Sequence, residues 1–154
     1  MLIPLAFVAV LAMPAQQLPP TTTATATVVT PPQAPYEFTS DLGAFLIIVK
    51  SEKAPMFETA MGRLRQALAQ STVAIRKQQA AGWRVLKSTE PPTDGNITYL
   101  FLIDPVIKQA SYDPIEIIRE LAPNDVQAVY DQLKDAWVSA TRIGLKELMK
   151  MGGS

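Results

Sequence analysis

Apolar and polar positions follow two periods between residues 41 and 149, and the change of period separates strands from helices. Three short segments are rich in β-branched and aromatic residues and are bounded by Gly, Pro, Asp or Asn. This pattern predicts strands over residues 43–50, 83–88 and 97–103. The Pro- and Gly-containing turn at residues 89–96 joins the last two strands into a hairpin.

Apolar residues at intervals of three and four predict the helices. The first runs from Pro55 to about Gln79, with the stripe Phe57, Met61, Leu64, Leu68, Thr72 and Ile75. A second begins where Asp113 can cap it and Pro114 fits the first turn, and it ends near Leu121. A third, long helix is predicted from residue 124 to about residue 149, with the stripe Val126, Val129, Tyr130, Leu133, Trp137, Ala140, Ile143 and Leu148.

The predicted order is therefore strand, helix, strand, strand, helix, helix. A right-handed crossover puts the first strand in the same sheet as the hairpin. In the simplest arrangement the first strand pairs with residues 97–103, which lie in the middle of the sheet, and helices cover one face. The predicted fold class is α+β, with a ferredoxin-like β-α-β-β-α core and an additional long C-terminal helix where a fourth strand would be expected.

The strand at 43–50, the helix that runs through residues 76–82 into Trp83, and the strand at 96–105 resemble the dimeric α+β barrel superfamily. This broad group includes antibiotic-biosynthesis-monooxygenase-like and NIPSNAP-like domains. The resemblance covers residues 42–122 and rests on element order and strand character. It implies the architecture and a homodimer, and no catalytic residue is carried over. Some members bind haem through a histidine, which this chain lacks.

Both faces of the central strands are apolar. Residues 97–103 offer Ile97, Tyr99, Phe101 and Ile103 to one face, and Leu100 and Leu102 to the other. The first strand likewise offers Phe45, Ile47 and Val49 against Leu46 and Ile48. Helices on one side would leave the second face in water, so something is expected to cover it. Three covers fit the sequence: a second copy of the chain, the long C-terminal helix, or an apolar ligand.

The first 36 residues contain no Asp, Glu, Lys or Arg, unlike the rest of the chain. Residues 1–15 read as a signal peptide or short hydrophobic leader without its usual basic residues, and they are too short to span a membrane. Residues 16–35 read as a disordered Pro/Thr-rich linker, and residues 36–154 as a single domain. We therefore expect a periplasmic or extracellular protein, attached to a membrane only if the leader is uncleaved.

The amino-acid composition excludes several kinds of catalytic and metal-binding site. The chain has no Cys and no His, which excludes disulfides, thiolate nucleophiles, Ser-His-Asp triads and the usual zinc and haem sites, so no metal or cofactor is predicted. Lys plus Arg equals Asp plus Glu, at 14 each. Residues 59–89 carry only basic charges, at Arg63, Arg65, Arg76, Lys77, Arg84 and Lys87. These are interpreted as a solvated helix face and hairpin, and nucleic acid is not a predicted partner.

The hairpin holds the remaining candidates for a site. Trp83, Tyr99 and Phe101 could line an aromatic cavity between sheet and helices. Tyr99 as proton donor and Asp104 as base would be needed for acid–base chemistry, but hairpin side chains alternate between faces and cannot all converge. The sequence therefore predicts an exported, non-catalytic domain that self-associates through its sheet. The alternative is a small apolar-ligand binder or a cofactor-independent, monooxygenase-like enzyme that uses the cavity.

Overall fold

The computed structural model describes residues 35–152, so the predicted leader (1–15) and nearly all of the predicted linker (16–35) lie outside the described residues. Two 3₁₀ turns, Ser51–Lys53 and Pro123–Asp125, precede α1 and α4. The strands and helices in chain order are β1 (Leu42–Lys50), α1 (Ala54–Gln70), α2 (Ala74–Gly82), β2 (Trp83–Lys87), β3 (Asn96–Ile103), α3 (Pro114–Leu121), α4 (Val126–Ala136) and β4 (Trp137–Leu145).

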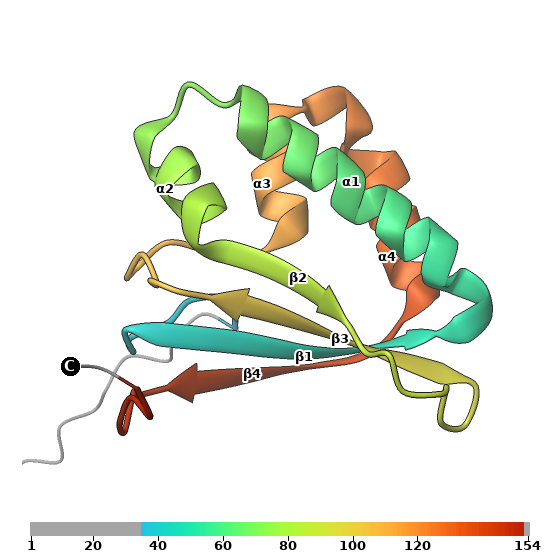
Figure 1. The fold of residues 1–154 in the computed structure, drawn as a ribbon. Helices are drawn as coiled ribbons and strands as arrows, with labels where there is room; N and C mark the ends of the chain where they lie inside the picture. Colours follow the sequence, from blue (N-terminus) through green and yellow to red (C-terminus); the bar gives the residue numbers. More distant parts are fainter. Residues whose placement is uncertain (1–34, 153–154) are drawn as a thin grey trace, which may run out of the picture. The chain divides into compact units, whose positions relative to one another are not determined.

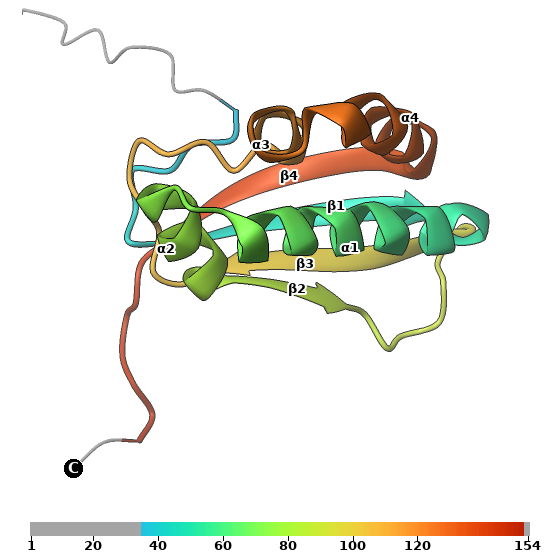
Figure 2. The same cartoon turned by 90° about the horizontal axis from the view of Figure 1, so that it is seen from above.

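The four strands form one antiparallel sheet in the order β2-β3-β1-β4. The fold class is α+β, as predicted. The expected pairing of the first strand with residues 97–103 is confirmed, with Phe45 opposite Phe101, and β3 lies between β1 and β2. All four helices lie on one face of the sheet (Figure 1). The view from above shows α1 running along the strands, with α3 and α4 beside it (Figure 2).

The prediction of a long C-terminal helix is wrong. Helix α4 ends at Ala136, and Trp137 begins β4, which pairs with the edge of β1 that β3 leaves free. The spacing of three between Trp137, Ala140 and Ile143 imitates a helical stripe. Two features of this segment favour a strand: β-branched residues are frequent between Val138 and Ile143, and pairing satisfies the backbone donors and acceptors along β1.

The predicted single helix from Pro55 to Gln79 is interrupted. Residues 71–73 are not helical, and the Ser71 hydroxyl accepts a hydrogen bond from the Val73 amide at 3.1 Å, an alternative to the helical pattern. The chain therefore restarts as α2 with a different face inward. Ile75, predicted to face the core, is 40% exposed, whereas Gln79 is fully buried.

The core lies between the helices and the face of the sheet that carries Phe45, Tyr99 and Phe101, the face predicted from alternation. Phe101 lies in the middle of this aromatic layer. Its ring centroid is 6.4 Å from that of Phe45, 6.2 Å from that of Phe57 and 5.6 Å from that of Trp83. The core-facing side chains of the sheet are thereby fixed by contacts with α1 and with one another.

Candidate functional site

The face of the sheet opposite the helices is apolar along its centre, with Thr98, Ser139 and Thr141 toward one end, and no helix of residues 35–152 packs over it. Alternation and register place Leu46 of β1 beside Leu100 of β3, which is itself paired with Leu86 of β2. Ala44 is similarly paired with Ile143 of β4. Leu46 lies on a central strand and is nevertheless 37% exposed, and Leu86 and Ile143 on the edge strands are 45% and 38% exposed. No helix lies beneath this face (Figure 1).

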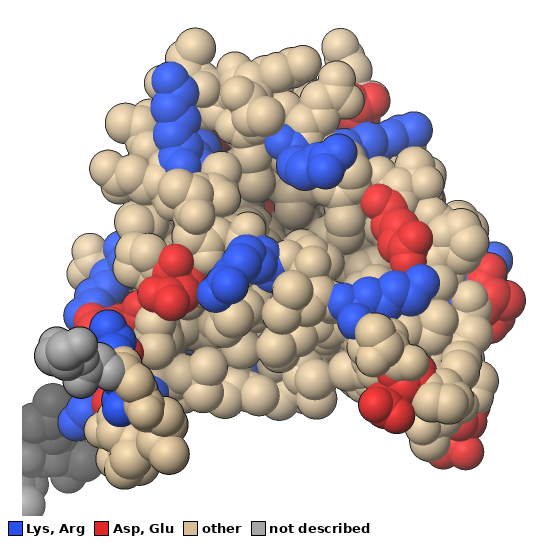
Figure 3. Space-filling view, in the orientation of Figure 1, with Lys and Arg blue, Asp and Glu red and all other residues tan. Residues whose placement is uncertain are grey.

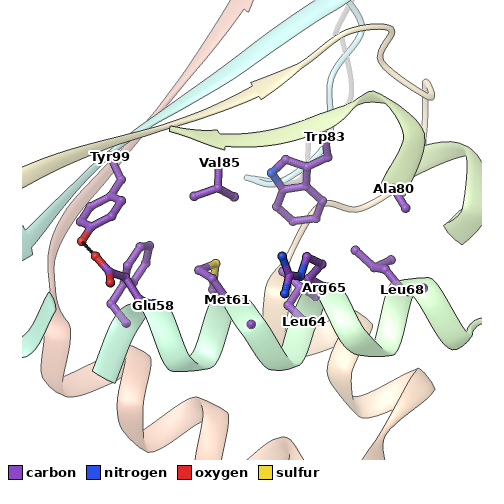
Figure 4. A pocket seen from close by; sticks show the side chains of 12 residues that line it. Glu58, Met61, Leu64, Arg65, Leu68, Ala80, Trp83, Val85 and Tyr99 are labelled. Atoms are coloured by element: carbon purple, nitrogen blue, oxygen red, sulfur yellow. Dashed lines mark hydrogen bonds between the residues drawn. The ribbon is translucent and has the colours of Figure 1, made fainter. Parts of the chain in front are cut away.

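A groove of about 490 Å³ lies between α1 and the edge strand β2. In the space-filling view the surface is hollowed between the helix layer and the sheet, and charged side chains stand at its margins (Figure 3). Trp83 and Val85 of β2 both point into the groove, because alternate residues of a strand share a face. Met61 and Leu68 rise from α1 to form the opposite wall, and Tyr99 of β3 lies at one end (Figure 4).

Three polar side chains meet at the Tyr99 end of the groove. The Glu58 Oε1 atom accepts hydrogen bonds from the Tyr99 hydroxyl at 2.7 Å and from Lys87 Nζ at 2.8 Å. The hydrogen bond from Lys87 is the main cause that lowers the pKa of Glu58, and the hydrogen bond from Tyr99 adds to it. Burial is the main cause that raises the pKa of Tyr99, and the hydrogen bond to Glu58 adds to it. Near neutral pH, Glu58 is therefore ionised and Tyr99 holds its proton firmly. Neither group is suited to general acid–base catalysis.

Beyond the middle of the groove, away from Tyr99, lie two side chains whose donors have no acceptor within residues 35–152. Arg65 rises from α1 toward the Trp83 ring (Figure 4), and its guanidinium forms no hydrogen bond or ion pair with the described chain. The Trp83 ring packs edge-to-face against the Tyr112 ring, with ring centroids 5.4 Å apart. Its Nε1 is buried and has no hydrogen-bond acceptor among residues 35–152. A buried donor without a partner costs about 1–3 kcal/mol.

The structure distributes the residues predicted from the hairpin among different surroundings. Trp83 and Tyr99 line the groove, whereas Phe101 is 2% exposed and lies in the core without lining it. Asp104 follows the end of β3 on the surface, and its amide donates to the Gly82 carbonyl at 2.8 Å. Tyr99 and Asp104 are five residues apart on an extended chain, about 16 Å, so they do not form an acid–base pair.

One buried polar network does not follow from the sequence pattern, which places Arg76 on a solvated face. That interpretation is wrong: Arg76 is 7% exposed, and its Nε and Nη2 donate to Glu120 Oε2 at 3.1 and 2.5 Å. Its Nη1 donates to Gln79 Oε1 at 2.7 Å and to the Ser111 carbonyl at 3.1 Å. Arg76 in turn lowers the pKa of Glu120. The network joins α2 to α3 and includes none of the lining residues of the groove beside α1.

Among residues 35–152, no three His, Cys, Asp or Glu side chains lie close enough together to hold a metal ion. None of the helices in that range has the length and apolar character needed to cross a membrane. No protein family matches the chain, and comparisons with curated proteins and with solved structures give no significant match. The open sheet face and the groove beside α1 are therefore the features on which a functional proposal depends.

Proposed function

We propose that the chain is a non-catalytic α+β domain of ferredoxin-like topology that functions as a homodimer, with two copies joined through their open sheet faces. The strand order β2-β3-β1-β4, with helices between β1 and β2 and between β3 and β4, supports this topology. The resemblance to the dimeric α+β barrel superfamily supports the dimer. The observation that carries the proposal is the uncovered apolar face, with Leu46 at its centre.

The size of the face suits a second copy. The area of the face follows from the dimensions of the sheet. Strands of about eight residues rise ~3.3 Å per residue, and the four strands lie ~4.8 Å apart, so the face measures roughly 500 Å² in each subunit. Two such faces give about 1,000 Å², which is near the lower limit for a specific protein interface. Full burial of a large aliphatic side chain contributes about 1.5–3 kcal/mol, so completing the burial of partly exposed Leu and Ile side chains on both copies favours association.

The charge pattern of the face also permits two copies of the chain to meet. A two-fold interface places each patch against itself, so a charge at its centre would meet a like charge. By strand alternation, Lys50 at the end of β1 and Arg84 on the edge strand β2 are the charged residues of this face, and the central rows carry none. Helix α4, the predicted alternative cover, packs against α1 on the opposite side of the sheet.

We also propose that this dimer acts outside the cytoplasm. The hydrophobic residues 1–15 and the Pro/Thr-rich residues 16–35 support export to the periplasm or the extracellular space. An uncleaved leader would be the means of membrane attachment, and the linker would hold the domain away from the membrane surface.

Sedimentation equilibrium on a chain that begins at residue 35 and so keeps all the described strands and helices tests the dimer. We expect the apparent mass to approach twice that of a single chain as the protein concentration rises, because association follows mass action. A mass that stays at one chain up to about 0.1 mM would contradict the proposal, since such weak association corresponds to less than about 5–6 kcal/mol of binding free energy.

A further inference from the structure

We infer that the groove between α1 and β2 is a binding site for a medium-chain alkyl carboxylate. The carboxylate would bind Arg65, and the alkyl chain would lie along Met61 and Val85 toward Tyr99. All of the lining residues belong to one chain, so this site does not depend on the proposed dimer.

The shape of the groove favours an elongated ligand. Its lining residues on α1 extend from Phe57 to Ala69, which is about 18 Å at 1.5 Å per residue. The facing wall consists of Trp83 and Val85 of the edge strand β2, with Ala80 of α2 at one end and Tyr99 of β3 at the other. The groove is therefore elongated, and its volume of about 490 Å³ lies within the range of small-molecule sites.

The charges of the groove favour an anion. At the Tyr99 end the Glu58 carboxylate is already paired with Lys87, so this end offers no unpaired charge. Arg65 has no such partner among residues 35–152 and is exposed beside the apolar walls, so it is the cation of the lining that is available to an anion. A guanidinium presents two parallel N–H groups that match the two oxygens of a carboxylate.

The position of Arg65 sets the orientation. Arg65 is eight residues from Phe57 and four from Ala69, so about 12 Å of groove lies on the Tyr99 side and about 6 Å on the other. The longer side is lined by Phe57, Met61 and Val85, which are apolar. An alkyl chain fits this side when its carboxylate is on Arg65.

Tryptophan fluorescence can test this site directly, because the chain has two tryptophans and the replacement Trp137→Phe leaves Trp83 as the sole reporter. Titration with decanoate, below the concentration at which it forms micelles, is expected to change the Trp83 emission saturably. Arg65→Gln should weaken decanoate binding about 10-fold or more, since a charge-assisted hydrogen bond is lost. Hexanoate should bind about tenfold or more weakly than decanoate because less apolar surface is buried.

Two control variants show whether decanoate binds in this groove or elsewhere on the chain. Arg63→Gln, on the same helix but outside the groove, should leave decanoate affinity unchanged. Leu46→Glu, on the open sheet face, should also leave it unchanged, whether or not the dimer forms. Absence of a saturable emission change, equal affinity in Arg65→Gln, or decanol binding as tightly as decanoate would each overturn the inference. Loss of binding in Leu46→Glu would place the ligand on the sheet face and would likewise overturn it.

Discussion

Replacing Leu46 by Glu is expected to convert the proposed dimer into a folded monomer. Leu46 lies on central strand β1 with Leu100 beside it on β3, at the middle of the apolar face. In a two-fold dimer the new carboxylates would be buried near each other, without a basic partner at the centre of the face. In the monomer the same side chain is 37% exposed and can reach water, so the fold should persist.

Sedimentation equilibrium of this variant should show at least a hundredfold weaker association, because removing a charge from water costs several kcal/mol. Ile75→Glu provides a matched control: Ile75 is 40% exposed on α2 in the helix layer, so the dimer should survive the same chemical change there. If Leu46→Glu associates as strongly as the unaltered chain, the interface does not include the centre of the sheet face.

Truncating Phe101 to Ala is expected to lower the free energy of unfolding by about 3–5 kcal/mol, the usual cost of removing a buried phenyl ring. Phe101 is 2% exposed and its ring contacts Phe45, Phe57 and Trp83, so its loss leaves a cavity bounded by other rings. Urea unfolding at one fixed protein concentration measures the change.

Tyr130→Ala on α4 is the matched control for this truncation. Tyr130 is 45% exposed, so removal of its ring should cost less than about 1 kcal/mol. If Phe101→Ala lowered the free energy of unfolding by no more than Tyr130→Ala does, Phe101 would not be part of a packed core. It would then again be a candidate for lining a ligand cavity.

The three strands predicted from the sequence are close to those observed because their signal is local. Residues 42–50 and 96–103 combine β-branched and aromatic side chains with alternating burial, and the turn between β2 and β3 contains Gly95 with φ of 73°. The cap of α3 is equally local: the Asp113 side chain accepts from the Ile115 amide at 2.8 Å, and Pro114 follows in the first turn. Elements of this kind can be recognised without knowing the rest of the fold.

The fourth strand could not be predicted in the same way, because its signal is not local. Residues 137–145 keep a helical spacing, and what decides their conformation is the free edge of β1, nearly the whole domain away in sequence. Tertiary pairing of this kind overrides local periodicity. With this strand in place, the C-terminal segment extends the sheet, and the second face of the sheet is left uncovered.

Only the lining residues that the sheet contributes to the groove can be recognised in the sequence. Trp83 and Tyr99 stand out because they are aromatic and lie on the hairpin, but nothing in the sequence indicates that Met61 and Arg65 face them. The placement of α1 over the sheet depends on packing between distant segments. The Glu58–Tyr99 and Arg76–Glu120 hydrogen bonds join residues 41 and 44 positions apart, so they too follow from the tertiary arrangement.

Thiol labelling provides the most direct test of what covers the sheet. The chain has no cysteine, so Leu46→Cys introduces a unique thiol on the open face, and Ile75→Cys introduces one on the helix layer as a control. If two copies meet through this face, the rate at which a maleimide modifies the Leu46→Cys protein falls as protein concentration rises, while the Ile75→Cys rate stays constant. Equal, concentration-independent rates for both variants would show that the face is open in solution and would contradict the sheet-to-sheet dimer.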